Sequence, residues 1–404
     1  MKPPQPPAIL PSGFRFAATA CGLKKTGALD LGLLLCDKPA SAAALFTSNL
    51  VKAAPVLLSR ENLRASKGRM RALVVNSGNA NCSVGPPGIA ASRATASRAA
   101  VELRCSPEEI FVCSTGVIGV PLPVGKILGA LPRIARASRS STRSFTEFAH
   151  AILTTDTRPK WAYAACRIGG KTVRLAGCAK GAGMIHPRMA TMLAFIVTDA
   201  AIAPGLLQKS LVDVNRRTFN CITVDGDSST NDTLLVFARG ASEARRIAPG
   251  SAAHRAFTQA LEKVCRSLAL QIVADGEGAQ RIIEIEVRGA RTEEGARRIA
   301  ETIATSPLVK TAFAGGDPNW GRILAAAGRA GVPFDPDAAV IQMARITVYR
   351  RGRALPFSET VAHRRLLAET VPIRVDLRAG SAAARVWTCD LTAEYVRINA
   401  SYRT

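Results

Sequence analysis

Thr191 stands between a glycine-rich segment and a strand-like apolar run in "KGAGMIHPRMATMLAFIVTDA". A threonine hydroxyl is a poor nucleophile at its ordinary pKa and needs a base beside it. If the Ala190–Thr191 bond breaks, the new α-amino group, with a pKa of about 7.7 to 8.0, can serve as that base. The hydroxyl can start the cleavage by attacking the preceding carbonyl, and the small Ala190 side chain leaves room for that attack. These residue types are those of a self-cleaving N-terminal nucleophile, although Ala-Thr ahead of a strand also occurs as plain structure.

The elements around Thr191 suit this chemistry, because a segment with conformational freedom meets a rigid one there. Gly181 and Gly183 can adopt backbone conformations that other residues avoid. The run "MLAFIVTDA" predicts a strand that is covered on both faces. Elsewhere, strand patterns at 71–76, 108–113, 167–177, 233–240 and 282–289 alternate with helix patterns at 88–103, 144–153 and 205–219. This order predicts an α+β fold, and 404 residues suggest two or three lobes.

Other motifs that could do chemistry are incomplete. "RIGGKT" ends like a phosphate loop but has Ala165 at the first glycine position, so it predicts a β-hairpin. The four histidines lack metal-ligand spacing. Asp225, Asp227 and Asp232 lack the other oxygen ligands of a calcium loop and favour a structural turn. No Gly-x-Ser-x-Gly motif is present. We expect neither a metal site nor a Ser-His-Asp triad.

The formal net charge of +24 raises the question of a nucleic-acid partner. The densest basic patch, residues 133–144, has no interleaved aromatic residues, and aromatics make up only 5% of the chain. A solvated arginine-rich face is therefore the better interpretation, and no nucleic-acid partner is expected. The N-terminus lacks a signal-peptide pattern, and no apolar run has the length of a membrane span. We expect a cytoplasmic protein with no membrane partner, whose ten cysteines stay reduced.

The order of the motifs along the chain points to a known family. They are "PSGFRFAATACGLKK", "FTSNLVKAAPV", "VVNSGNANC", "STGVIG", "TTDT", "KGAGMIHPRMATML", "DGDSSTNDT", "DGEGA", "GGDPNWGRIL" and "YVRINASYRT". Together they closely resemble the ornithine acetyltransferase family, the glutamate N-acetyltransferases of arginine biosynthesis. The resemblance implies a layered αββα sandwich like that of the N-terminal-nucleophile enzymes. It also implies acetyl transfer from N-acetylornithine to glutamate through an acetyl-Thr191 ester.

Carried onto this sequence, the resemblance implies a self-cleavage between Ala190 and Thr191, giving an α chain of residues 1–190 and a β chain of residues 191–404. Thr115 and Gly116 of "STGVIG" would stabilise the oxyanion. The remaining implied residues contact the substrate: Thr154, Lys180, Thr191 itself, Glu277, Asn399 and Thr404. His186 departs from the small or apolar residue that we expect there, and the first half is more basic than expected.

The family also implies an assembly and a cofactor state. By this resemblance we expect two α and two β chains to form a heterotetramer, and we expect no metal or prosthetic group to be needed. Some members use acetyl-CoA as a co-substrate, and the motifs do not distinguish them from members that do not. An amidohydrolase that releases acetate from N-acetylornithine with the same nucleophile is the alternative function.

Overall fold

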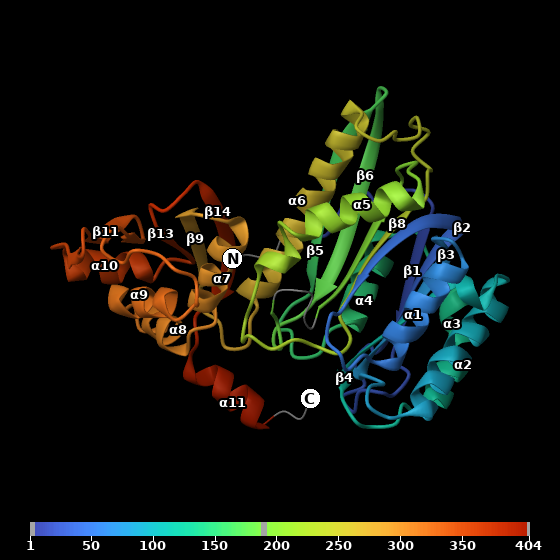
Figure 1. The fold of residues 1–404 in the computed structure, drawn as a ribbon. Coiled ribbons are helices and arrows are strands. Elements are labelled where there is room, and N and C mark those ends of the chain that lie inside the picture. Colours follow the sequence, from blue (N-terminus) through green and yellow to red (C-terminus); the bar gives the residue numbers. More distant parts are fainter. Residues whose placement is uncertain (1–4, 187–191, 402–404) are drawn as a thin grey trace. The chain divides into compact units, whose positions relative to one another are not determined.

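The computed structural model describes residues 5–186 and 192–401, which fall into two compact units (Figure 1). The larger unit spans Lys2–Asn220 and Ser228–Ile272. The smaller unit spans Cys221–Asp227 and Val273–Arg403. This division agrees with the expected number of lobes.

An eight-stranded sheet runs through the larger unit in the order β4-β3-β2-β8-β7-β6-β5, with β1 paired to β2. Its strands are β1 (Phe14–Thr19), β2 (Leu31–Phe46), β3 (Arg69–Asn79), β4 (Ile110–Val117), β5 (Lys160–Ile168), β6 (Lys171–Lys180), β7 (Leu193–Thr198) and β8 (Thr233–Ala238). The helices are α1 (Ala54–Ala65), α2 (Pro86–Leu103), α3 (Val124–Ala137), α4 (Thr142–Ala151), α5 (Pro204–Asn215) and α6 (Ala252–Ala274).

Strand β2 belongs to two layers of this sheet. Its first half pairs with β1 and β3, and after an irregularity between Leu35 and Ala40 its second half pairs with β8. The sheet therefore divides into a β1-β2-β3-β4 layer and a β2-β8-β7-β6-β5 layer. Side chains of both layers share one buried core, in which the rings of Phe111 and Phe237 meet edge to face at 5.6 Å.

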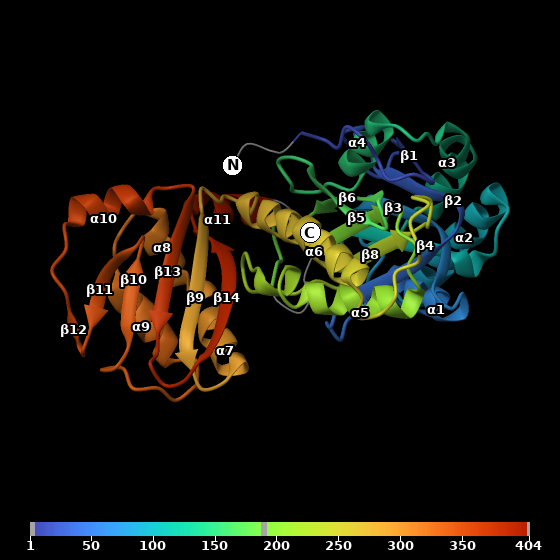
Figure 2. The same ribbon diagram turned by 90° about the horizontal axis from the view of Figure 1, so that it is seen from above.

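Helices cover the outer face of each layer (Figures 1 and 2). Ile127 and Leu131 of α3 join Leu33 and Val74 in the core beneath α1, α2 and α3. On the other layer, Gln208 of α5 bonds both the N–H and the carbonyl of Ala44. Gln271 of α6 donates to the Trp161 carbonyl at 3.0 Å. The larger unit is thus a four-layer αββα arrangement, and the predicted fold class is confirmed.

The strand that follows Thr191 is confirmed as β7. It pairs with β6 on one side and with β8 on the other, and all six of its residues are buried. The hairpin expected at "RIGGKT" is also confirmed, since β5 and β6 pair up to Ile168 and Lys171. Gly169 and Gly170 form its turn with φ values of +56° and +79°, which suits a tight turn between twisted strands.

The smaller unit is a six-stranded sheet in the order β12-β11-β10-β13-β9-β14. Its strands are β9 (Ile282–Ala290), β10 (Val340–Met343), β11 (Ile346–Arg350), β12 (Arg353–Ala354), β13 (Thr370–Asp376) and β14 (Ala382–Cys389). Its helices are α7 (Glu293–Ala304), α8 (Pro307–Ala314), α9 (Trp320–Gly328), α10 (Glu359–Leu366) and α11 (Ala393–Ser401). Helices α7, α8 and α9 pack their apolar residues against the sheet in one core.

The arginines of the basic patch lie at the surface, as the sequence predicts. Arg133, Arg136, Arg139 and Arg143 of the basic patch are all exposed on and between α3 and α4. All ten cysteines are free thiols. Of the helices in the described residues, none combines the length and apolarity that crossing a bilayer requires.

Candidate functional site

The residue directly after Thr191 is held by two hydrogen bonds. The Met192 N–H donates to Oδ1 of Asp232 at 2.8 Å, and the Met192 carbonyl accepts from the Thr233 N–H at 3.0 Å. Ala190 and Thr191 themselves lie outside the described residues. Met192, the second residue beyond the predicted cleavage point, is therefore fixed beside the beginning of β8.

Thr115 and Gly116, the predicted oxyanion residues, lie near the end of β4. Thr115 is buried, and Gly116 has φ of +133°. A Cβ atom on Gly116 would lie 2.4 Å from the Gly78 carbonyl carbon and 2.5 Å from the Asn79 nitrogen. Because the backbone of β3 approaches so closely, only glycine fits at this position.

Gly116→Ala tests whether this close approach of the β3 backbone requires glycine at position 116. We expect the substitution to lower the free energy of unfolding by at least about 1–3 kcal/mol, because backbone strain and a backbone clash coincide. Gly119→Ala is the matched control, since Gly119 has φ of +77° but no atom within 4 Å of its added Cβ. Chemical denaturation of both variants separates the two effects. Equal losses would show that the approach of Gly78 is not limiting.

The loop that precedes β8 forms hydrogen bonds both to strand β4 and to the residue before β7. Asn231 donates through Nδ2 to the carbonyls of Ala80 and Ser114, each at 2.8 Å. The next residue, Asp232, holds Met192. The two residues before β8 therefore fix the residue that precedes Thr115 and the residue that follows Thr191.

Lys180, a predicted substrate contact, belongs to a buried ionic cluster in the larger unit. It is 3% exposed at the end of β6, and its Nζ lies 3.9 Å from Oδ2 of Asp156. The Asp156 side chain is fully buried and also accepts from Lys160 Nζ at 2.6 Å. Burial alone would raise the pKa of Asp156, but the charges of Lys160 and Lys180 and hydrogen bonds to the carboxylate hold it below its usual range.

Asp156 also connects the predicted Thr154 with Lys180. Its Oδ2 accepts from the Thr154 N–H at 3.1 Å, and its Oδ1 accepts from the Gly181 N–H at 2.6 Å. The "TTDT" turn and the end of β6 are thus fastened to one carboxylate. The structure brings Thr154 and Lys180 together through a residue that the sequence did not single out.

Glu277 and Asn399 meet in the smaller unit. Asn399 donates through Nδ2 to Oε2 of Glu277 at 2.8 Å, although the two residues are 122 positions apart. Gly278 has φ of +72°, and a Cβ there would lie 2.7 Å from the Tyr395 nitrogen. The turn that carries Glu277 therefore packs closely on α11, which carries Asn399. Thr404 lies outside the described residues.

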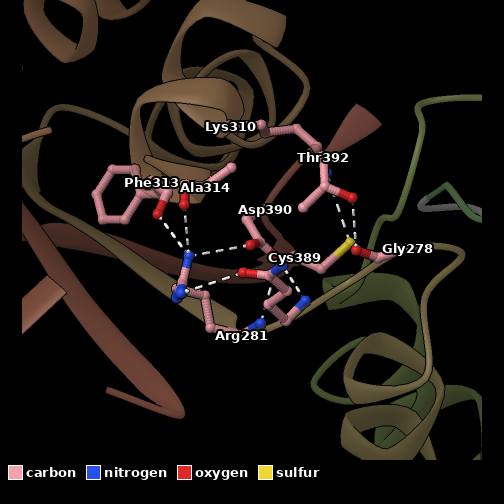
Figure 3. Close-up of polar contacts among 9 residues, drawn as sticks. Gly278, Arg281, Lys310, Phe313, Ala314, Cys389, Asp390 and Thr392 are labelled. Carbon is pink, nitrogen blue, oxygen red and sulfur yellow. Dashed lines mark hydrogen bonds and ion pairs between the residues drawn. The ribbon is translucent and has the colours of Figure 1, made fainter. Parts of the chain in front are cut away.

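A buried polar network supports this turn (Figure 3). Arg281 forms an ion pair with Asp390 at 3.1 Å and donates to the carbonyl of Phe313 at 2.8 Å. Thr392 donates to the Gly278 carbonyl at 2.8 Å. Asp390 also accepts from the N–H groups of Gln280 and Arg281, so the chain that follows Glu277 is fixed.

Two of the aspartates considered for a cation site form hydrogen bonds with different partners. Asp225 accepts from the Tyr395 hydroxyl, whereas Asp232 holds Met192. Among the described residues no group of three His, Cys, Asp or Glu is arranged to hold a metal ion. The sequence analysis did not identify Asn231 or Asp156, and it considered Asp232 only as a cation ligand or turn residue. The available signal was the polar run "SSTND" ending directly at an apolar strand.

The larger unit is an αββα sandwich in which Met192, the residue after Thr191, is anchored at the start of a strand. The model of the ArgJ family matches residues 15–404. The chain belongs to the ArgJ family. The predicted resemblance to the ornithine acetyltransferases is thereby confirmed, and with it the prediction of an acetyltransferase of arginine biosynthesis.

Individual relatives are similar over nearly the whole chain. The arginine biosynthesis bifunctional protein ArgJ of Chlorobaculum tepidum is 47% identical over 394 residues, covering 98% of this chain and 96% of the relative. That of Brucella melitensis is 49% identical over 399 residues, covering 97% and 95%. The crystal structure of the Bacillus halodurans ArgJ protein matches with a TM-score of 0.50 and 43% identity, covering 52% of this chain and 98% of that one.

Proposed function

We propose that the protein transfers an acetyl group from N-acetylornithine to glutamate through an ester on Thr191. The observation that carries this proposal is membership of the ArgJ family, and the anchoring of Met192, the residue after the proposed nucleophile, supports it. The same loop fixes Ser114, the residue before Thr115. A nucleophile and an oxyanion-stabilising group must be held in a constant relation for acyl transfer, and this loop can supply that relation.

The proposed first half-reaction releases ornithine. The Thr191 oxygen bonds to the acetyl carbon while its proton passes to the α-amino group of Thr191. Donors at Thr115 and Gly116 stabilise the tetrahedral oxyanion. The acetyl C–N bond then breaks, and the proton goes to the departing amine of ornithine.

The second half-reaction repeats these steps with glutamate as the nucleophile. The glutamate amine attacks the ester carbonyl, the bond to the Thr191 oxygen breaks, and the hydroxyl regains a proton. In our proposal Lys180 pairs with a substrate carboxylate and Glu277 accepts from an ammonium group. Thr154, Asn399 and Thr404 orient the substrate by hydrogen bonds.

Maturation precedes this chemistry in the proposal. The Thr191 hydroxyl attacks the Ala190 carbonyl, the acyl group shifts from nitrogen to oxygen, and water releases the α chain at Ala190. The β chain then begins with the nucleophile. Two α and two β chains assemble as a heterotetramer in the cytoplasm, without a metal or prosthetic group. We also propose acetyl-CoA as a second acetyl donor, as in some members of the family that the sequence resembles.

Incubation with N-acetylornithine and glutamate, followed by mass spectrometry of products and polypeptides, tests the proposal. We expect ornithine and N-acetylglutamate in equal amounts, together with an acetylated β chain. Release of acetate that does not depend on glutamate would favour the amidohydrolase instead. Acetyl-CoA in place of N-acetylornithine tests the second donor.

The fold predicts that the two cleaved chains stay together. Strands β7 and β8 of the β chain pair with β6 and β2 of the α chain, and Phe111 and Phe237 meet in the shared core. Breaking one backbone bond removes none of these contacts. We expect two polypeptides on a denaturing gel but one species in size-exclusion chromatography. An α chain that elutes alone under native conditions would contradict this.

A further inference from the structure

Lys24 is a half-buried lysine on a firmly held loop of the larger unit. The buried carboxylate of Asp30 accepts from the backbone N–H groups of Cys21, Leu23 and Lys24, at 2.7, 2.6 and 3.0 Å. These three bonds fix the course of the loop and satisfy the carboxylate without the Lys24 ammonium. Within the described residues, that ammonium forms one hydrogen bond, to the Leu29 carbonyl at 2.8 Å, and no ion pair.

The stem of the Lys24 side chain lies close to the predicted oxyanion residue Gly116. A Cβ atom on Gly78 would lie 3.3 Å from Cγ of Lys24 and 3.4 Å from the carbonyl atoms of Leu23. The backbone of the same Gly78 excludes a side chain at Gly116. Only one residue therefore separates the loop that carries Lys24 from the predicted oxyanion position.

Lys24 is also a neighbour of the predicted substrate contacts. Its ammonium lies within electrostatic range of Asp156 and Lys180. The Ser77 hydroxyl, one residue before Gly78, donates to the Ala151 carbonyl at 2.6 Å and so fastens the end of β3 to the end of α4. Helix α4 leads into the "TTDT" turn. Lys24 therefore adjoins both the oxyanion residues and the substrate contacts of this unit.

The charges around Lys24 leave a positive excess. The Asp156 carboxylate is already shared by Lys160 and Lys180, so three lysines face the two carboxylates of Asp30 and Asp156. Burial lowers the pKa of Lys24, against the charges of Asp30 and Asp156, and the charge of Lys180 lowers it further. A partly desolvated cation beside a second cation gains when an anionic group binds to it.

The two amino acids of the proposed reaction differ in the charge of their side chains. N-acetylornithine has one carboxylate and a side-chain ammonium, whereas glutamate has two carboxylates. In our proposal Lys180 pairs with one carboxylate of the substrate. A site that receives these two molecules in turn needs a further cation for glutamate alone.

We infer that Lys24 is a specificity-determining residue that binds the side-chain carboxylate of glutamate, while Lys180 binds the other carboxylate. This inference rests on the proposed function and adds a residue to it. A charge-assisted hydrogen bond of this kind is about twice as strong as one to a neutral group. Lys24 therefore favours glutamate over the neutral glutamine as the acetyl acceptor.

Lys24→Met removes the charge and keeps a long side chain. We expect kcat/KM for glutamate to fall about 10- to 100-fold, mainly through KM, as for the loss of a hydrogen bond to a charged group. Transfer to glutamine, and acetylation of the β chain by N-acetylornithine alone, should change little. Lys24→Arg keeps the charge and should keep the preference for glutamate. Lys25→Met, at the exposed neighbouring lysine, is the control and should match the wild type.

A second measurement uses the wild-type protein and does not depend on how the variants fold. Reductive methylation with formaldehyde, followed by peptide mass spectrometry, reports the accessibility of each lysine amine. We expect glutamate to protect Lys24 from methylation, and glutamine at the same concentration to protect it less. Lys25 should be methylated equally in both samples.

The inference is overturned if Lys24→Met keeps the wild-type ratio of kcat/KM for glutamate over glutamine, or if glutamate does not protect Lys24. An equal loss with both acceptors would also overturn it, because a merely structural role lowers both alike. The proposed function fails differently, since the wild-type protein itself would then form no N-acetylglutamate.

Discussion

Thr191→Ala is expected to yield a single uncleaved chain of 42.6 kDa that transfers no acetyl group. Without the hydroxyl neither the N-to-O shift nor the ester can form, so one substitution removes maturation and turnover together. Loss of an acyl-transfer nucleophile typically lowers kcat by about 10⁴- to 10⁶-fold. Intact mass spectrometry and an assay of N-acetylglutamate formation measure the two effects on the same sample.

Thr191→Ser is the matched variant, because it keeps both a hydroxyl and the potential α-amine. We expect it to be cleaved and to retain measurable transfer. Thr26→Ala, at an exposed threonine of the larger unit, should behave as the wild type. Cleavage of Thr191→Ala at position 190 would mean that another group attacks the backbone, and the proposed maturation would be wrong.

The local features of this fold could be predicted from the sequence, because they depend on neighbouring residues. The apolar run after Thr191 is β7, and Gly169–Gly170 turns the β5–β6 hairpin. The doubling of β2 into two layers was not predicted, because Asp37, Lys38 and Pro39 interrupt the apolar pattern of residues 31–46, and the sequence does not show that one strand continues past them with new partners. Residues 31–46 pair with three strands, and only the tertiary structure shows where the partners change.

The supporting contacts of the site were also beyond the sequence. Asp232 reaches Met192 across 40 positions, and Asn231 reaches Ser114 across 117. In the sequence both belong to a polar loop whose composition is typical of turns. The family resemblance predicted which residues take part in the reaction. The hydrogen bonds that hold these residues in place can be seen only in the three-dimensional structure.

Asp156→Asn is expected to destabilise the larger unit strongly. The carboxylate lies between Lys160 and Lys180, which are 0% and 3% exposed. The substitution removes one negative charge from beside two buried ammonium groups. Breaking a buried ion pair in this way costs about 3–5 kcal/mol. Denaturant unfolding of the wild type and the variant at neutral pH measures the loss.

The pH dependence has a definite sign. The pKa of Asp156 is held below its usual range in the folded protein. The carboxylate therefore stabilises the fold fully at any pH above the ordinary pKa of an aspartate, which includes neutral pH. That stabilisation is lost as the pH falls below the ordinary carboxyl range. The wild type should therefore lose stability toward acid, and the difference between wild type and Asp156→Asn should shrink there.

A double-mutant cycle identifies the charge as the cause. Lys160→Met removes the closest cation, which lies 2.6 Å from Asp156. If uncompensated charge causes the loss, the double variant Asp156→Asn/Lys160→Met should lose less stability than the two single losses added together. Additive losses would instead assign the effect to the Thr154 and Gly181 hydrogen bonds, which the asparagine oxygen can keep only in part. Because Lys180 shares this carboxylate, Asp156→Asn should also lose acetyl transfer. Asp213→Asn, at an exposed aspartate on α5, is the control and should keep both stability and turnover.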